Sequence, residues 1–436
     1  TKTVHLPYDA MIHEARTPDT KNGAQTGFYP GGEYIFQKHF TAPQAWQGKP
    51  VSLVFEGVYQ TALVYLNGWL LTRNVNGYAE FTVEAGPYLK YGADNLLKVI
   101  ADNSLEPNSR WYTGSGIYRP VRLLVGNKVY LPQDTVRITT READEGFALL
   151  DVTAQVQSAS TVTERVTLQQ TICREGTAVL TDRQNLLLQP GESRTVSFRY
   201  CVDSPALWSP ENPNLYTSTM QVLEGEEELD REETGFGIRT LSIDAAHGVR
   251  INGQTVKLRG ACIHHDNGIL GAATLPDAEE RRIRQLKEAG FNAIRSSHHP
   301  AGRALLDACD RYGVLVMDEL SDVWNVRKNP YDYALYFEQD WEPTIQKMVA
   351  KDYNHPSVIL YCVGNEISEA GSESGAETNR RLCNTFRELD PTRYTTNARQ
   401  RLMAAGYACG EIIGGCDAKG SRHSPVPPAR SGGGSN

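Results

Sequence analysis

The sequence lacks any apolar run long enough to cross a membrane, because its longest hydrophobic stretches have only the length of a strand. It also lacks a basic tract, and the formal net charge of -8 at pH 7 argues against nucleic acid as a natural partner. Residues 1–8 show no charged segment followed by an apolar one, so we expect no secretory signal there. These absences predict a globular protein with neither a membrane nor a nucleic-acid partner.

Paired cysteine spacing is missing as well. The eight cysteines are scattered without a CxxC motif, and most fall inside predicted strands or helices, where cysteine behaves as a small hydrophobic residue. This spacing favours free, buried thiols in a reducing compartment over disulfides or a metal site. We accordingly expect a cytoplasmic location.

A chain of 436 residues is too long for one ordinary core, so two or three domains are expected. Residues 1–127 are rich in short β-forming runs that turn signals separate, and no helical period interrupts them. The strongest hairpin signal is Asn67-Gly68, which lies between the apolar runs at 63–66 and 69–71. This spacing predicts a jelly roll or sandwich.

Residues 128–240 continue as β-structure in which apolar and polar residues alternate along each run. Such alternation is typical of a sandwich with one solvated face per sheet. The length fits an immunoglobulin-like β-sandwich of roughly 100 residues. Because this segment holds no cluster of catalytic residue types, we expect it to be a spacer.

Strands and helices alternate strictly over residues 241–400, which predicts a parallel α/β unit. A complete (β/α)8 TIM barrel takes about 250 residues, whereas this segment has room for only four to five units. Residues 401–436 have an irregular, linker-like composition that is rich in Pro, Gly and Ser. We therefore expect an incomplete barrel that belongs to a longer enzyme.

Polar residues follow each predicted barrel strand. The apolar run at 358–363, for example, leads through Gly364 to Asn365 and Glu366. Parallel α/β folds place their chemistry at the carboxyl ends of the strands, so these residues should line one cleft. The groups that follow the four strands are His264-His-Asp-Asn-Gly, Ser296-Ser-His-His-Pro, Asp318-Glu with Asp322 and Trp324, and Asn365-Glu.

Two chemistries could use such a set. A metal hydrolase would use the His and Asp residues as ligands, but adjacent histidines in a strand point to opposite faces, so each pair offers one ligand at most. A glycosidase needs a proton donor, here Glu366, and a second carboxylate. Asn365 could bind the hydroxyl beside the anomeric carbon, and Trp324 could supply an apolar wall for a sugar, although a packing role fits Trp324 equally well. We favour the glycosidase and expect neither a metal nor a cofactor.

Several motifs resemble glycoside hydrolase family 2, the β-galactosidase and β-glucuronidase group. A segment near residue 110 is also similar to the sugar-binding jelly roll of that family. The motifs are Gly235-Phe-Gly-Ile-Arg-Thr, Lys257-Leu-Arg-Gly-Ala, His264-His-Asp-Asn-Gly, Asn292-Ala-Ile-Arg-Ser-Ser-His-His-Pro, Val316-Met-Asp-Glu, His355-Pro-Ser-Val-Ile, Gly364-Asn-Glu and, in the N-terminal segment, Asn108-Ser-Arg-Trp-Tyr-Thr-Gly-Ser-Gly-Ile-Tyr-Arg-Pro-Val.

The resemblance implies a retaining mechanism in which Glu366 is the acid/base and Asn365 its hydroxyl-binding neighbour. Three further residues, His298, Asp322 and Trp324, match positions that contact the bound sugar. Arg110 lies in the jelly-roll loop that reaches toward the barrel mouth in that family. The His264-His-Asp-Asn-Gly form is more similar to β-galactosidases, which implies terminal β-D-galactosides or a related oligosaccharide as substrate.

The chain also departs from the family pattern. The family's nucleophile is a second Glu on a late barrel strand, and this chain ends before that strand; Glu411, in the tail, is a poor candidate. We therefore expect the 436-residue chain to be nearly inactive alone. The alternatives are a β-glucuronidase of the same family or a non-catalytic carbohydrate-binding fragment, and a homo-oligomer is compatible with each of them.

Overall fold

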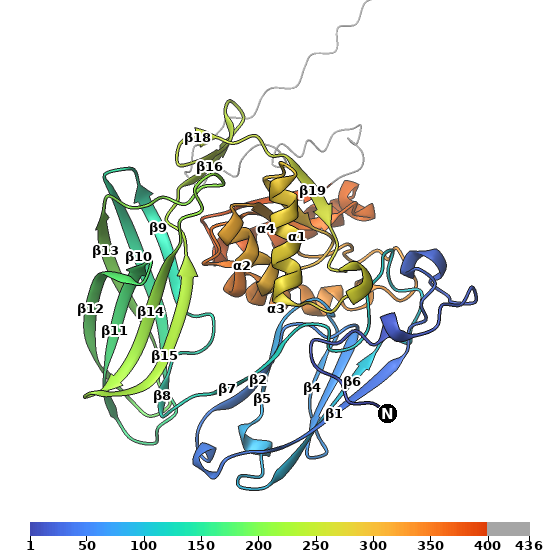
Figure 1. Cartoon of the computed structure of the whole chain (residues 1–436), viewed down its shortest axis with the longest axis horizontal. Coiled ribbons are helices and arrows are strands. Elements are labelled where there is room, and N and C mark those ends of the chain that lie inside the picture. The colour runs from blue at the N-terminus through green and yellow to red at the C-terminus, as the bar shows by residue number, and fades with distance from the viewer. Residues whose placement is uncertain (399–436) are drawn as a thin grey trace, which may run out of the picture.

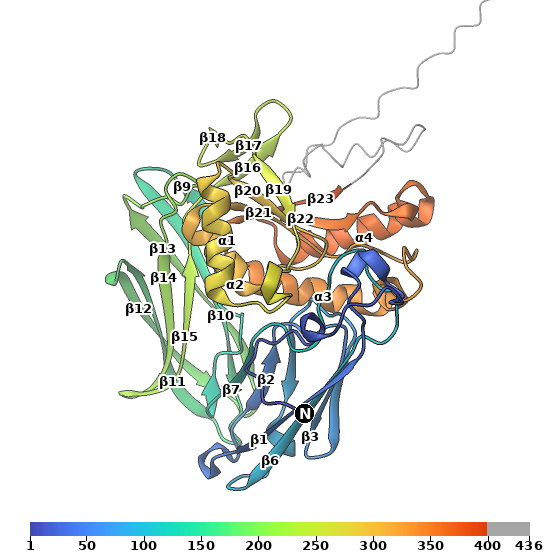
Figure 2. The same ribbon diagram turned by 45° about the vertical axis from the view of Figure 1, so that its right-hand side comes forward.

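The computed structural model describes residues 1–398 as two antiparallel β-domains followed by a parallel sheet with helices. In Figure 1 the first β-domain lies below the helices of the third domain, and the second β-domain stands beside them; Figure 2 shows the same arrangement from another side. This confirms the predicted order of jelly roll, sandwich and incomplete barrel. No helix among residues 1–398 is long and apolar enough to cross a membrane.

The jelly-roll domain packs two sheets against each other, with strand orders β1-β6-β3-β4 and β5-β2-β7. Buried and partly exposed residues alternate along β3, which fits a strand with one face in the core. The predicted hairpin at Asn67 and Gly68 is present, and both residues have positive φ, 53° and 90°, as a type I′ turn requires. The strands are β1 (Glu33–Thr41), β2 (Val51–Phe55), β3 (Thr61–Leu66), β4 (Trp69–Asn74), β5 (Phe81–Glu84), β6 (Asp94–Asp102) and β7 (Val121–Val125).

The second domain is a sandwich of two antiparallel sheets. One sheet has the order β13-β10-β8 with β9 paired to β10, and the other has the order β12-β11-β14-β15. Its core consists of the inward-facing apolar side chains of both sheets, as the alternation predicted. The strands are β8 (Val129–Tyr130), β9 (Arg137–Ala143), β10 (Phe147–Ser158), β11 (Glu164–Arg174), β12 (Thr177–Leu188), β13 (Ser193–Asp203), β14 (Tyr216–Glu224) and β15 (Glu227–Phe236).

The third domain holds five parallel strands in sequence order, joined by helices that cover the outer face. A small antiparallel sheet of three strands precedes it. This is part of a (β/α)8 barrel. The elements are β16 (Leu241–Asp244), β17 (Gly248–Ile251), β18 (Gln254–Thr255), β19 (Gly260–Ile263), α1 (Pro276–Glu288), β20 (Ala293–Ser296), α2 (Arg303–Tyr312), β21 (Leu315–Glu319), α3 (Phe337–Asp352), β22 (Val358–Asn365), α4 (Glu373–Leu389) and β23 (Tyr394–Ala398).

Short 3-10 helices occur in the connections between these elements. They are η1 (Met11–His13), η2 (Gly23–Thr26), η3 (Gln44–Trp46), η4 (Gly86–Tyr88), η5 (Gly268–Leu270), η6 (Tyr333–Leu335) and η7 (Ser368–Gly371).

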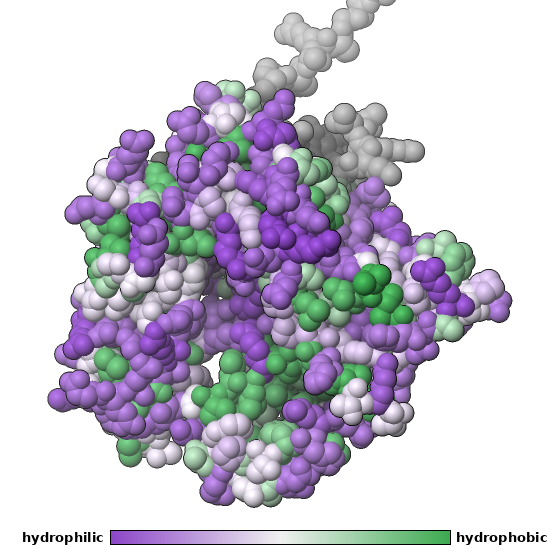
Figure 3. All heavy atoms as spheres, viewed as in Figure 1, coloured by the Kyte–Doolittle hydropathy of each residue, from purple (hydrophilic) through white to green (hydrophobic). Residues whose placement is uncertain are grey.

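One arginine connects all three domains. Arg303, the first residue of α2, donates to Glu80 of the jelly-roll domain at 2.9 Å and to Asp134 of the sandwich domain. We call these three residues the Arg303 bridge. Arg303 and Asp134 line an open crevice of about 990 Å³ between the domains. Figure 3 shows the hollow between the sandwich and the jelly roll.

The cysteine prediction was only partly right. Cys309 and Cys362 are buried, free thiols, as expected. Cys201 and Cys262 are free but exposed. Cys201 lies on the solvent-facing side of β13, and Cys262 lies on the same face of the parallel sheet as Arg295, whose Nη1 is 3.9 Å from its Sγ. Cys409 and Cys416 lie outside the described residues.

Candidate active site

The buried strand β22 delivers Asn365 and Glu366 to the carboxyl end of the sheet. Gly364 precedes them where no side chain fits, since a Cβ there would lie 2.7 Å from Nε1 of Trp324. Glu366 has a φ of 45°, in the left-handed region that is costly for a residue with a side chain and is often found at functional sites. Its side chain is 34% exposed, so the carboxylate is only partly shielded from solvent.

Hydrogen bonds fix the orientation of the Asn365 amide. Its Oδ1 accepts from Arg295 at 2.9 Å, and its Nδ2 donates to Asp322 at 2.8 Å. A carboxamide has two N–H donors and two acceptor lone pairs. Asn365 therefore retains one N–H and one lone pair for a ligand beside Glu366.

Asp322 receives three cationic or amide donors. Arg110 binds it through Nε at 3.2 Å and Nη2 at 2.7 Å, and Lys328 donates to it at 2.9 Å. Burial alone would raise the pKa of Asp322, but the hydrogen bonds from Arg110, Lys328 and Asn365 hold it below its usual value. Asp322 is thus a carboxylate that positions its neighbours.

Arg110 completes the site from another domain. It lies in the jelly-roll loop between β6 and β7, and its Nη1 is 3.7 Å from Oε2 of Glu366. Its side chain is 34% exposed. The bidentate pair with Asp322 places a guanidinium directly beside the Glu366 carboxylate.

His298 is held by the fully buried carboxylate of Glu319. Its Nδ1 donates to Oε1 at 2.7 Å, while Arg295 donates to the other oxygen. Within the part of the chain that the structure describes, no residue is hydrogen-bonded to Nε2 of His298, so this nitrogen can meet a ligand. Because Arg295 also binds Asn365, the two site residues are connected through one guanidinium.

Trp111 supplies an aromatic surface at the mouth of the site. Its ring lies 5.2 Å from that of His264 and 5.5 Å from that of His298. Its Nε1 donates to the hydroxyl of Tyr78 at 3.0 Å, which fixes the ring. A cavity of about 50 Å³ touches Trp111, His298 and Asp322 and extends between the jelly roll and the barrel.

Trp324 does not form the apolar wall that we predicted. Its side chain is fully buried among the helices and strands of the barrel, and its Nε1 donates to the Val363 carbonyl at 2.8 Å. The loop after β21 folds inward over the core, so this ring packs rather than lining the mouth. The remaining predicted residues, Arg110, His298, Asp322, Asn365 and Glu366, do lie together.

Three contributing residues were missed in the sequence. Lys328 donates at 2.7 Å to the Asn365 carbonyl as well as to Asp322. Arg295 and Trp111 stand inside motifs that we had noted, next to residues already chosen. Their positions at a strand end and beside Arg110 were a usable signal, whereas nothing local marks Lys328.

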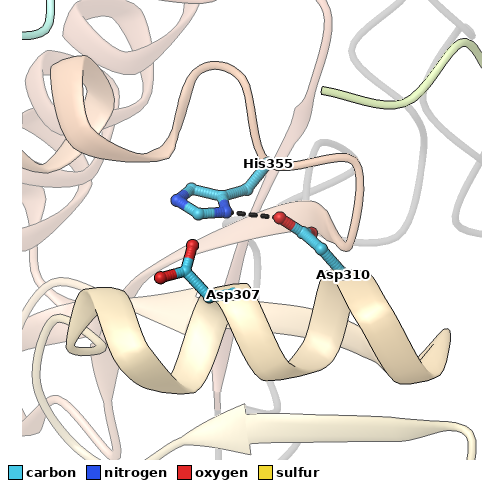
Figure 4. Close-up of side chains that lie close together, drawn as sticks. All are labelled: Asp307, Asp310 and His355. Carbon is cyan, nitrogen blue, oxygen red and sulfur yellow. Dashed lines mark hydrogen bonds and ion pairs between the residues drawn. The ribbon is translucent and has the colours of Figure 1, made fainter. Parts of the chain in front are cut away.

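One other cluster has the composition of a metal site. Asp307, Asp310 and His355 lie close together (Figure 4), and their ligand atoms are within 4.8 Å of one another. However, Nδ1 of His355 already donates to Asp310 at 2.5 Å, and the second oxygen of Asp310 accepts the Ser357 N–H at 3.0 Å. Burial would lower the pKa of His355, but Asp310 raises it above the usual value, which favours the protonated ring over the neutral ring that a metal ion needs.

Comparisons with known proteins agree with this architecture. Residues 8–147 match the family described as "Glycosyl hydrolase 2 galactose-binding domain-like", and residues 129–239 match "Glycosyl hydrolases family 2". Residues 245–412 match "Glycosyl hydrolases family 2, TIM barrel domain". The three matches occur in the order in which the domains follow along the chain.

Individual relatives include enzymes of two specificities. The chain is 38% identical to the β-galactosidase BoGH2A of Bacteroides ovatus over 86% of its own length and 44% of the relative. It is 27% identical to a β-glucuronidase of Bacteroides fragilis over 91% of its own length and 58% of the relative. The chain thus spans about half the length of the curated relatives it matches.

Solved structures show the same fold. A glycosyl hydrolase family 2 member from Bacteroides cellulosilyticus superposes with a TM-score of 0.90 and 36% identity, over 92% of this chain and 53% of that one. The β-glucuronidase of Bacteroides uniformis gives a TM-score of 0.79 and 28% identity, over 91% of this chain and 49% of that one. From its three matched domains and this shared architecture, the chain belongs to glycoside hydrolase family 2.

Proposed function

We propose that this chain is the N-terminal part of a retaining glycoside hydrolase that cleaves terminal β-D-galactosides. The observation that carries the proposal is the placement of Glu366, a partly exposed carboxylate at a strand end, beside the oriented amide of Asn365. Support for a galactoside comes from the β-galactosidase relative and from the His264-His-Asp-Asn-Gly motif.

In the first step, Glu366 donates a proton to the leaving oxygen as the glycosidic bond breaks. In the second step, the same residue removes a proton from the water that releases the sugar. The free N–H of Asn365 reaches the hydroxyl beside the anomeric carbon, an interaction that strengthens in the transition state. Trp111 offers its ring to the apolar face of the sugar, in the role that we first gave to Trp324.

The second carboxylate comes from outside the described residues. Near Glu366, the carboxylates of Asp322 and Glu319 already neutralise Arg110, Lys328 and Arg295. A retaining enzyme needs its nucleophile about 5–5.5 Å from the acid/base, on the opposite side of the anomeric carbon. The family resemblance assigns that residue to a later strand, and Glu411 lies outside the described residues.

The test compares two lengths of protein on two substrates. The 436-residue chain and a version extended through the missing barrel strands are assayed with 4-nitrophenyl β-D-galactoside and β-D-glucuronide. We expect the short chain to be nearly inactive and the extended one to cleave the galactoside. Glu366→Gln should reduce that rate by about 10²–10⁴-fold. A product of inverted configuration, or a rate that survives this substitution, would refute the mechanism.

A β-glucuronidase is the second candidate, and Arg110 is the observation that favours it. Its guanidinium is partly exposed beside Glu366, where it could also bind a uronate carboxylate. If the extended protein prefers the glucuronide, and if Arg110→Gln abolishes this preference, the protein is a β-glucuronidase. If the short chain binds galactose but neither the short nor the extended protein turns over any substrate, the chain would be a carbohydrate-binding fragment instead.

A further inference from the structure

Arg119 of the jelly-roll domain is hydrogen-bonded to the loop that carries His298. The residue lies just before β7, and its guanidinium donates to the Pro300 carbonyl at 3.0 Å and to the Tyr78 carbonyl at 2.7 Å. Pro300 is two residues beyond His298 in the chain. The contact therefore joins two domains next to the candidate active site but outside it.

A small, partly open space lies beside this contact, between β19, β20 and the ends of α1 and α2. Its volume is about 10 Å³, close to the minimum of about 10–15 Å³ that one water molecule needs. The side chains of Arg119, His265, His299 and Glu279 line it, and each is only 3–7% exposed. The space is too small for a sugar or a nucleotide.

Each of these four side chains has a buried polar atom without a hydrogen-bond partner among the described residues. Such atoms are rare in folded proteins and are usually satisfied by an ordered water when no protein group reaches them. His264, which also lines the space, adds a fifth. The atoms are Nε of Arg119, Nδ1 of His265, Nε2 of His299, Oε2 of Glu279 and Nδ1 of His264.

The hydrogen bonds of the two buried histidines fix which nitrogen carries the proton. Nε2 of His265 lies 2.8 Å from the Thr113 carbonyl, which can only accept, so Nδ1 of His265 bears a lone pair. Nδ1 of His299 likewise donates to the Pro300 carbonyl at 3.1 Å, which leaves a lone pair on Nε2. Burial lowers the pKa of His265 to about 3 and that of His299 well below its usual value, so both rings are neutral.

The unpartnered atoms therefore comprise one donor, the Nε–H of Arg119, and at least two acceptors on His265 and His299. One water molecule complements three of these atoms, on Arg119, His265 and His299, because it can accept one hydrogen bond and donate two; Oε2 of Glu279 lies instead 3.7 Å from Nε of Arg282. Three hydrogen bonds are typical of a buried water. A cation is disfavoured, since it would meet the Arg119 guanidinium and leave the Nε–H unpaired.

We propose that this space binds one ordered water molecule, which hydrogen-bonds Arg119 of the jelly roll to His265 and His299 of the barrel. The water thereby holds the segment from His298 to Pro300 against both domains. His265 and His299 are positioning residues in this arrangement, because they act on the loop that carries His298 through the water and not on the substrate. Their rings lie 4.9 Å apart at 87°, in an edge-to-face contact beside the same space.

The direct test is a crystal structure of the 436-residue protein at a resolution that shows ordered water. We expect one light-atom peak within about 2.7–3.2 Å of Nε of Arg119, Nδ1 of His265 and Nε2 of His299. Data collected above the zinc edge should give no anomalous signal there. An empty space, or an anomalous peak that marks a metal ion, would overturn the proposal.

A pair of variants at His299 tests the hydrogen bond separately. In His299→Gln, the amide can take the place of Nε2 and accept from the water, whereas in His299→Asn it takes the place of Nδ1 and keeps only the Pro300 contact. Both variants lose the stacking of the His299 ring on Tyr78, so they are matched for packing.

We expect the water peak to persist in His299→Gln and to vanish in His299→Asn, whose Tm should be lower by roughly 2–4 °C. Equal Tm values together with equal density at the site would contradict the proposal. If either variant fails to fold, the density in the unmodified protein still decides the question.

Discussion

At the carboxyl end of the parallel sheet, His298 donates to Glu319; at the amino end, His355 donates to Asp310. The pairs have the same chemistry and different surroundings. The second oxygen of Asp310 accepts the Ser357 N–H, so both of its oxygens bind groups inside the fold. His298 keeps Nε2 free at the edge of a cavity, beside groups from another domain.

The difference separates ion pairs that stabilise the barrel from those that could serve a substrate. At the amino end, His355 and Asp310 pair with each other and their side chains are mostly buried, at 13% and 8% exposed. At the carboxyl end, Arg110 and Glu366 stay partly exposed, and Asn365 retains unused hydrogen-bonding capacity. Spare capacity at a partly exposed edge, rather than charge alone, marks the candidate site.

The largest expected effect is on stability at the amino end. Asp310→Ala leaves the His355 ring and the Ser357 N–H without their partner in a buried environment. We expect the free energy of unfolding to fall by about 3–5 kcal/mol, measured by urea titration of the 436-residue chain. Glu366→Gln is the control from the other end and should change it by less than about 0.5 kcal/mol. Similar losses of unfolding free energy in both variants would show that the two ends of the sheet do not differ in this way.

A smaller loss of stability with a loss of binding is expected for Glu319→Gln. The neutral amide cannot balance both Arg295 and His298, and the cost should be about 1.5–3 kcal/mol. Because Arg295 also orients Asn365, galactose affinity should fall as well, as titration calorimetry would measure. Unchanged affinity would show that this network does not position the site.

Trp111→Ala should act on binding and hardly on stability. Loss of the ring removes a sugar-stacking surface worth roughly 1 kcal/mol, or about a fivefold weaker affinity for galactose. Trp69→Ala, at the exposed start of β4, is the matched control and should leave the affinity unchanged. Equal effects of the two substitutions would remove Trp111 from the proposed sugar surface.

The smallest effect is a pH dependence with opposite signs at different histidines. Since the folded pKa of His355 is raised, its contribution to stability is complete below about pH 6.5 and is lost as pH rises through the folded value. The folded pKa of His265 is lowered to about 3, so its contribution is present above about pH 6.5 and is lost as pH falls.

We therefore expect the Tm difference between the unmodified protein and His355→Asn to shrink between about pH 6 and about pH 9, measured by calorimetry. The exposed His5→Asn should show no such trend. A difference that grows with pH would contradict the assigned sign.

The strand and helix order could be predicted because its signals are local. Asn67-Gly68 specifies its hairpin through two positive φ angles, and the helix ending at Gly313 stops at a left-handed residue with φ of 64°. The cluster of Arg110, Asp322, Asn365 and Glu366 followed from strand ends and from family motifs. Turn residues, helix ends, strand ends and family motifs predict where the backbone places a residue, and they were sufficient to place this cluster.

Which side chains touch could not be predicted in the same way. Trp324 was placed in the mouth although the loop after β21 buries it, since burial of a loop residue depends on distant packing. Lys328 lies in an irregular loop, and only the folded chain shows that it reaches Asp322 and Asn365. The cysteines were expected to be buried, but Cys201 lies on the exposed face of β13, and a shift of one residue along a strand changes the face.

The Arg303 bridge has a consequence for how Arg110 reaches its target. The jelly roll contacts the barrel at two places, through the Glu80–Arg303 pair and through the Arg110–Asp322 pair. A rotation of the jelly roll about the first contact would separate Arg110 from Asp322. Asp134 of the sandwich domain binds the same Arg303 guanidinium, and this third contact restrains such a rotation. The segment without catalytic side chains thus keeps the mouth aligned from a distance.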